Sequence, residues 1–143
     1  MRIIIAGGRD FNNLTLFNSV IKDKLKLLKG THYSIKENIE IISGHASGAD
    51  TLGEDFANKW GLKLTKFPAE WDNLLVVSCV IKHNKFGQPY NALAGHNRNK
   101  EMAKYAKEDN GVLIAFHDGK STGTKNMINL ANEYGLKVFI INY

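Results

Sequence analysis

Short apolar runs alternate with amphipathic segments along the whole chain. The apolar runs are typical of buried β-strands and lie at 2–6, 39–43, 63–67, 111–116 and 137–142. Between them, apolar residues recur at steps of three and four, which predicts helices over 13–29, 49–60, 96–107 and 124–134. A polar connection is expected over 30–38. The alternation indicates an α/β fold, with a Rossmann-like, open, mainly parallel five-stranded sheet and helices on both faces.

One segment, residues 72–95, interrupts this alternation. It contains an apolar run over 74–81, followed by a stretch rich in turn residues. The segment is either a hairpin or loop that packs on the body, or a lid or subunit contact. Because an apolar run of this length is costly to leave in water, something should cover it. Self-association is slightly favoured, so we expect a homodimer or larger assembly through 74–81, with the ligand site near the interface.

Length and composition narrow the class of protein. A chain of 143 residues predicts one domain over 1–143, with 72–95 as an insertion. The single cysteine, Cys79, excludes an intrachain disulfide and a cysteine-based metal cluster within one chain. The sequence has neither a signal-peptide pattern nor an apolar stretch of the ~20 residues that a membrane helix needs. We therefore expect a cytoplasmic protein that does not contact a membrane.

The net charge of +5 allows either nucleic acid or a phosphate-bearing small molecule as partner. The lysines are spread along two segments, as in solvated helix faces, rather than gathered in a binding stripe. Nucleic acid is therefore the less expected partner, and a small anionic molecule is the more expected one.

Glycine, hydroxyl and charged residues gather where the predicted strands end. In an open parallel sheet, ligands bind beyond the carboxyl ends of the strands, where the strand order reverses. The loops at 7–10, 43–50, 68–71 and 117–124 should meet at that edge. Two of them, 47–49 and 121–124, are small-residue turns that enter helices, where free N–H groups and the helix dipole favour phosphate or carboxylate. The alternative is that their glycines only permit tight turns.

Arg9 and Arg98 stand out in a chain whose other cations are almost all lysine. A guanidinium suits phosphate, and a cation at the start of a helix opposes the dipole, so Arg98 is expected to meet an anion. The alternative for Arg98 is a salt bridge to Asp72 or Asp118. Either Trp71 or Phe11 could stack on a base, although an aromatic near a turn is as often part of the core.

Three acids near this edge, Asp10, Glu70 and Asp118, are candidates for a catalytic base or a ribose contact. His45, His96 and His117 lie in the same loops, but no pair has a spacing typical of metal ligands, so no metal is expected. No cofactor is expected either. The expected ligand-binding residues are Gly7, Gly8, Arg9, Asp10, Phe11, Ser43, Gly44, Ser47, Gly48, Ala49, Asp50, Pro68, Trp71, Arg98, Asn99, Gly119, Ser121, Thr122, Gly123 and Thr124.

Two common nucleotide motifs are incomplete. The stretch 119–121 ends like a Walker A loop, but the opening glycine would fall at Ile114. Gly7 and Gly8 lack the third glycine of a dinucleotide-binding fingerprint. Kinase, ATPase and ordinary dehydrogenase functions are therefore disfavoured.

Five ordered blocks resemble the YspA-like branch of the SLOG superfamily. They are IAGGRDF at 5–11, SGHASGAD at 43–50, FPAEW at 67–71, GHNRNKEM at 95–102 and the glycine–threonine loop at 116–127. The superfamily includes the LOG-type phosphoribohydrolases and DprA, and its members bind nucleotides or their derivatives as signal sensors or N-glycosidic hydrolases. The resemblance thus implies a nucleotide-derived ligand at the positions named above.

The chain departs from the LOG enzymes at their catalytic glutamate, whose position is Met127 here. Three functions follow from these observations. The first is binding of a nucleotide-derived signal, such as an ADP-ribose derivative or cyclic nucleotide, for sensing or for sequestration in phage–host immunity. The second is hydrolysis or transfer at a glycosidic or phosphate bond, with Asp10, Glu70 or Asp118 as base. DprA-like binding of single-stranded DNA ranks last.

Overall fold

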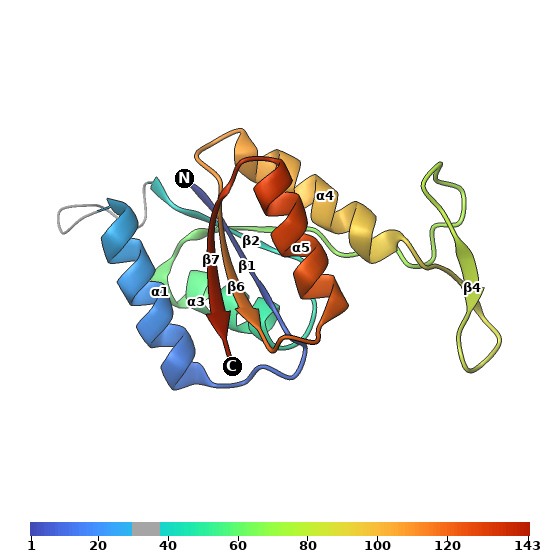
Figure 1. Ribbon diagram of the computed structural model, residues 1–143, viewed down its shortest axis with the longest axis horizontal. Coiled ribbons are helices and arrows are strands. Elements are labelled where there is room, and N and C mark those ends of the chain that lie inside the picture. The colour runs from blue at the N-terminus through green and yellow to red at the C-terminus, as the bar shows by residue number, and fades with distance from the viewer. Residues whose placement is uncertain (30–37) are drawn as a thin grey trace.

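The computed structural model describes residues 1–29 and 38–143 (Figure 1). The polar connection expected over 30–38 lies outside these residues, apart from Asn38. The helices are α1 (Leu14–Lys29), α3 (Ala49–Trp60), α4 (Ala94–Lys107) and α5 (Thr122–Glu133). The strands are β1 (Arg2–Gly7), β2 (Glu40–Ser43), β3 (Lys63–Lys66), β4 (Ile81–His83), β5 (Pro89–Asn91), β6 (Val112–His117) and β7 (Lys137–Asn142).

Five of these strands form one parallel sheet in the order β3-β2-β1-β6-β7. Ile4 of β1 is in register with Ile42 of β2 on one side and with Leu113 of β6 on the other. The chain builds the sheet outward from β1 in one direction and then returns to add β6 and β7 in the other. The strand order therefore reverses between β1 and β6, which is where an open α/β sheet leaves a crevice beyond its carboxyl ends.

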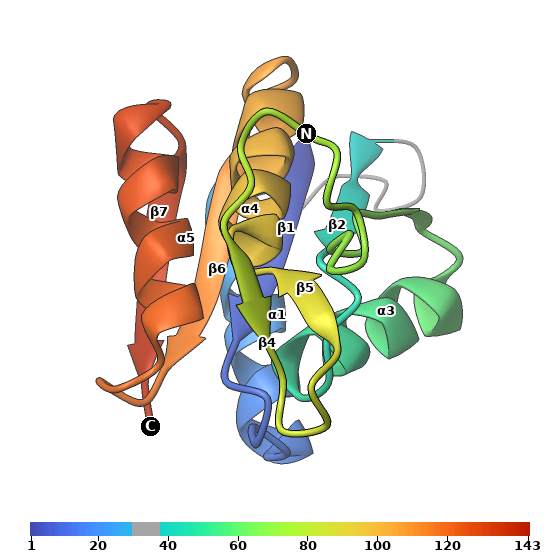
Figure 2. The same cartoon turned by 90° about the vertical axis from the view of Figure 1, so that its right-hand side faces the viewer.

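Helices cover both faces of the sheet, because side chains alternate between the faces along each buried strand. Ile3 and Ile5 of β1 belong to the core under α1 and α3, whereas Ile4 and Ala6 belong to the core under α4 and α5. Figures 1 and 2 show α4 and α5 side by side on one face, with α1 and α3 on the other. The predicted α/β fold, with a five-stranded parallel sheet between two helical layers, is confirmed.

The inserted segment forms a separate antiparallel hairpin of β4 and β5. Asn91 fastens its base: the buried side chain accepts the N–H groups of Val80 (3.3 Å) and Leu93 (3.0 Å), and its backbone N–H donates to the Trp71 carbonyl (2.7 Å). Beyond this base the hairpin projects away from the sheet (Figure 1). Of the two forms considered for the segment, a hairpin is present, but the side chains of Leu75 and Val77 are almost fully exposed, at 96% and 105%.

Self-association through residues 74–81 stays a prediction. If a second copy covers these side chains, the protein should scatter light as a species larger than 16.0 kDa at micromolar concentration. A Leu75→Ser, Val77→Ser double variant should then scatter as the monomer, because burying two such side chains contributes about 3–6 kcal/mol to association. A monomeric wild-type protein would contradict the prediction.

No helix in the described part of the chain is long and apolar enough to span a membrane.

Candidate functional site

A cavity of about 820 Å³ lies beyond the carboxyl ends of β1 and β6, at the reversal of strand order. We call it the main cavity. Its walls come from the loop after β1, from the first turns of α4 and α5, and from Trp71. The expected site residues that line it are Gly7, Gly8, Arg9, Asp10, Asp50, Trp71, Arg98, Asn99, Ser121, Thr122, Gly123 and Thr124.

A smaller hollow of about 340 Å³, the side cavity, adjoins the main cavity beyond the end of β2. The two cavities share Arg9, Trp71 and Arg98 among their lining residues. The side cavity adds three further expected residues, Gly44, Ser47 and Pro68, together with His45. The sheet edge therefore brings residues from all four predicted loops to one connected site, as the strand-end rule implies.

Five expected residues line neither cavity: Phe11, Ser43, Gly48, Ala49 and Gly119. Phe11 is 3% exposed and stacks on Phe116 with ring centroids 4.6 Å apart, so it belongs to the core and cannot stack on a base. The backbone N–H of Ala49 donates to the Gly8 carbonyl (3.3 Å).

The turn at Gly48 holds two loops together. Gly48 has a φ of 76°, and a Cβ there would collide with the carbonyl of Gly8 and the backbone of Arg9. The first turn of α3 is thus joined to the loop after β1. The glycine at this position therefore permits a close contact between loops. Ser47 lines the side cavity, and a phosphate cradle at 47–49 stays a prediction.

Arg9 and Arg98 bring two positive charges to the shared wall of the cavities. Arg98 is partly buried: its Nη1 donates to the carbonyls of Gly44 and Phe67, and its Nε donates to Oδ1 of Asn99 (2.9 Å). Burial lowers the pKa of Arg98 and the positive charge of Arg9 lowers it further, while Asp50 opposes both. Arg9 is exposed and has no hydrogen bond or ion pair with the described residues. An anion between these cations would relieve their repulsion.

No salt bridge joins Arg98 to Asp72 or Asp118 among the described residues, and the acid whose charge raises the pKa of Arg98 is Asp50. Asp50 is 6% exposed, lies in the first turn of α3 and accepts the N–H of Ala46 (3.3 Å). Burial raises the pKa of this carboxyl to about 6, against the lowering effect of the Ala46 N–H and Arg98. Arg98 is therefore both a positive wall of the cavity and a structural tie between α4 and the ends of β2 and β3.

The start of α5 presents open backbone donors to the main cavity. Ser121 caps the helix by accepting the N–H of Thr124 (3.3 Å), and Asp118 accepts the N–H groups of Lys120 and Ser121 (both 2.8 Å). The next two N–H groups, of Thr122 and Gly123, have no acceptor among residues 1–29 and 38–143. A Cβ on Gly123 would meet no atom within 4 Å. This glycine is not required by packing, and it leaves the helix start accessible.

A chain of amides connects α4 and α5 at the floor of the cavity. Buried Asn99 donates to the Gly123 carbonyl (3.3 Å) and to Oδ1 of Asn126 (2.9 Å), and Asn126 bonds to Nδ1 of His96 (2.8 Å). Asn126 was not among the expected residues, although it lies three positions after Gly123 and so on the same face of α5. Met127, which the resemblance to the LOG enzymes aligns with their glutamate, is 1% exposed and lines the same cavity.

Of the three candidate acids, Asp10 and Asp118 line the main cavity, whereas Glu70 does not. Asp10 accepts the hydroxyl of Tyr143 (3.0 Å), and burial together with Asp10 raises the pKa of that hydroxyl to about 12. The N–H groups of Lys120 and Ser121 hold the pKa of Asp118 below its usual value, which makes it a weak base.

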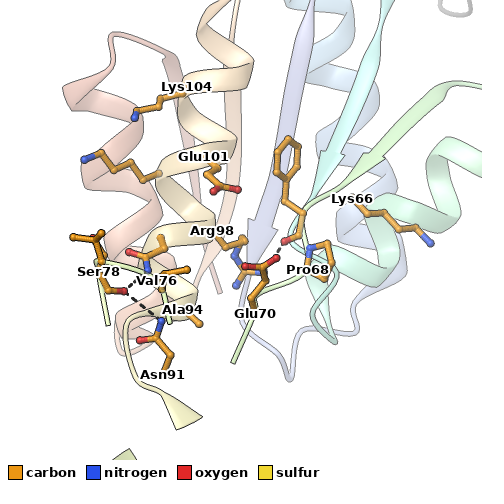
Figure 3. A pocket seen from close by; sticks show the side chains of 14 residues that line it. Lys66, Pro68, Glu70, Val76, Ser78, Asn91, Ala94, Arg98, Glu101 and Lys104 are labelled. Carbon is orange, nitrogen blue, oxygen red and sulfur yellow. Dashed lines mark hydrogen bonds between the residues drawn. The ribbon is translucent and has the colours of Figure 1, made fainter. Parts of the chain in front are cut away.

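Glu70 lines a third hollow, of about 520 Å³, between α4 and the insertion. Figure 3 shows Glu70 beside Pro68 and Arg98. No described group of three or more His, Cys, Asp or Glu side chains could hold a metal ion.

Comparison with known proteins bears mainly on the first half of the chain. No curated protein and no solved structure matches the chain. The model of the YspA, cpYpsA-related SLOG family matches residues 1–73, which carry β1 to β3 and three of the five sequence blocks. The blocks at 95–102 and 116–127 lie outside the matched residues. Since the match spans half of the chain, this protein belongs to the YspA, cpYpsA-related SLOG family.

Proposed function

We propose that the protein binds a nucleotide-derived small molecule, with a phosphate group of the ligand in the main cavity. The observation that carries the proposal is that Arg9, Arg98 and the open start of α5 line the same cavity. Two cations that repel each other, and two backbone N–H groups without acceptors in the described part of the chain, are complementary to an anion. Membership of a SLOG family points to nucleotide-related binding or activity at a coarse level.

Trp71 is the aromatic residue that could stack on a base. Its side chain is 37% exposed, contacts Gly95 at the start of α4 and lines both cavities. The edge of Tyr90 supports it, with ring centroids 6.3 Å apart. Cavities of this size typically hold a ligand the size of a drug molecule or a nucleotide. A phosphate near α5 and a base on Trp71 together describe such a ligand.

Binding alone is enough for the biological role that we propose, which is to sense or sequester a signal nucleotide. The buried Met127 supplies no carboxylate where the LOG enzymes have their glutamate. A thermal-shift screen against mononucleotides, ADP-ribose derivatives and cyclic dinucleotides tests the proposal. A ligand at 100 times its dissociation constant stabilises the fold by about 2.7 kcal/mol. If only oligonucleotides raise the melting temperature, with strong salt dependence, the small-molecule proposal is wrong.

The Arg9→Ala variant should lose about tenfold to 100-fold in affinity for the ligand found in that screen. Loss of a charge-assisted contact from an exposed guanidinium costs about 1.5–3 kcal/mol of binding. The fold should be unaffected, because Arg9 makes no hydrogen bond or ion pair with the described residues. Isothermal titration calorimetry measures the change. Lys26→Ala, which removes an exposed cation from α1, is the matched control and should bind as the wild type does.

A further inference from the structure

His45 has a backbone conformation that is uncommon for residues other than glycine. It follows directly after β2 and Gly44, and its φ of 58° lies in the left-handed region. Within the described residues, only His45 and Asn110 have a positive φ without being glycine. Glycine adopts this conformation without strain, whereas a side chain makes it unfavourable. Strain of this kind is concentrated at functional sites, so the imidazole itself needs an explanation.

The second observation is the partner of the imidazole. Nδ1 of His45 lies 2.8 Å from Oε1 of Glu54, a residue of α3 that is 9% exposed. Ser43 joins the pair, because its hydroxyl donates to the same Oε1 (2.7 Å) and accepts the backbone N–H of His45 (3.0 Å). Lys66 lies 3.6 Å from the other oxygen, Oε2.

These contacts fix the tautomer of the imidazole. Although burial would raise the pKa of Glu54, the hydrogen bonds from His45 and Ser43 and the positive charge of Lys66 lower it, so the carboxylate is ionised. An ionised carboxylate holds the proton of a neutral imidazole on Nδ1 and leaves the lone pair of Nε2 free to accept a proton. Nε2 has no partner among the residues that the structure describes.

The imidazole lies beside the proposed ligand site. His45 lines the side cavity together with Arg9 and Arg98, and its side chain is 51% exposed. The positive charges of the two arginines favour cleavage of a phosphorus–oxygen bond over cleavage of a glycosidic bond. Glycosidic cleavage develops positive charge on the sugar, which two guanidinium groups would oppose. Cleavage of a phosphorus–oxygen bond leaves negative charge on the phosphoryl oxygens, which they would stabilise.

We propose that His45 is the general base of a hydrolytic reaction on a diphosphate-linked nucleotide, with Glu54 as the residue that positions it. This inference rests on the proposed binding function. Nε2 takes a proton from a water molecule, and the water oxygen forms a bond to one phosphorus. The bond from that phosphorus to the bridging oxygen breaks, and its electron pair leaves with the bridging oxygen. His45 then returns the proton to that oxygen or to solvent, and the products are two phosphate monoesters.

The test uses the full chain with ADP-ribose, NAD and UDP-glucose as probes. Thermal shift selects the probes that bind, and mass spectrometry follows their conversion to two monoesters. His45→Gly is the informative variant, because glycine keeps the positive φ while the imidazole is lost. It should lower kcat by about 100-fold or more, as expected for a lost general base, and leave the dissociation constant within about threefold. Free imidazole in the buffer should restore part of kcat, which a purely structural role would not allow.

Two further variants define the roles. Glu54→Gln should lower kcat by about tenfold, because the amide no longer holds the Nδ1 proton as firmly. His83→Gly, in the exposed strand β4, is the matched control and should turn over as the wild type does. A probe that binds but returns intact, or a His45→Gly variant with wild-type kcat, would overturn the inference and leave the binding function standing. If no nucleotide of any kind binds, the proposed function fails first.

Discussion

The Gly123→Val variant should lose about 100-fold or more in ligand affinity, equivalent to ~2.7 kcal/mol, without losing stability. Gly123 is the second residue of α5, and the space where its Cβ would be holds no atom within 4 Å. Because Gly123 lines the main cavity and is one of the two residues with an open N–H group, we expect a valine side chain there to obstruct the ligand's approach to these groups. Folding should not suffer, because valine is no worse than glycine in a helix.

Calorimetric titration and a melting curve on the same sample separate the two effects. Asn129→Val is the matched control, since it adds the same side chain to an exposed position of α5 that does not line the main cavity. Gly123→Ala should give an intermediate loss of affinity. Wild-type affinity in Gly123→Val would mean that the ligand does not approach the start of α5, and the phosphate would have to be sought beside Arg9 alone.

Gly48 and Gly123 show which features of the site the sequence could predict and which it could not. Gly48 comes just before α3 and Gly123 is the second residue of α5. Both lie beyond the carboxyl ends of the strands, and their local sequences predict the same role for both. The structure separates them: Gly48 is required because the loop after β1 packs on it, whereas Gly123 is open to the cavity. That difference depends on which loop packs against which, and no local pattern encodes it. The loops themselves were predictable, because their position follows from strand direction.

The strands and helices were predictable to within about two residues, because hydrophobic periodicity reports which face is buried. Periodicity could not show what covers the apolar run at 74–81. Leu75 and Val77 precede β4 and are exposed in the single chain, and their coverage by a second copy stays a prediction. Apolar runs that form strands of a sheet with helices on both faces are buried by those helices. An inserted segment outside the sheet has no helices that must cover it.

Side-chain pairing was the least predictable feature of the site. His45 and Glu54 are nine positions apart, on a loop and on a helix, and they meet only because α3 packs back against the end of β2. Arg98 was expected to bind an anion, and the structure adds a second role: its guanidinium bonds to the carbonyls of Gly44 and Phe67, which follow two different strands. Both features depend on how the elements pack, and spacing along the chain does not reveal them.

The protein should become more stable as the pH falls from 7.5 to 5, by about 1 kcal/mol or about 4 °C in Tm. The cause is Asp50, whose carboxyl has a pKa of about 6 in the folded protein and 3.8 as a reference. Burial disfavours its ionised form, so the folded state binds more protons than the unfolded state between these two values. The penalty is present above pH 6 and disappears as Asp50 is protonated.

Further acidification should reverse the trend. The pKa values of Glu40 and Glu54 are lowered in the folded protein from 4.5, because their hydrogen bonds and neighbouring cations outweigh burial. Their contribution to stability is present above pH 4.5 and is lost as the pH falls through the folded values. The melting temperature should therefore pass through a maximum near pH 4.5, because Asp50 alone would give only a rise on acidification and the two glutamates alone only a fall.

Asp50→Asn identifies the source of the rise. An asparagine cannot ionise, so the increase in Tm between pH 7.5 and 5 should vanish, while the fall below pH 4.5 remains. Asp55→Asn, on the exposed face of the same helix, should keep the wild-type profile. If Asp50→Asn also keeps the rise in Tm, a group other than Asp50 takes up the proton between pH 7.5 and 5. Asp50 would then stay ionised over this range, with its negative charge compensated by Arg98. In that case Arg98 would be less free to attract an anion, and the proposed phosphate contact would depend on Arg9 and the start of α5.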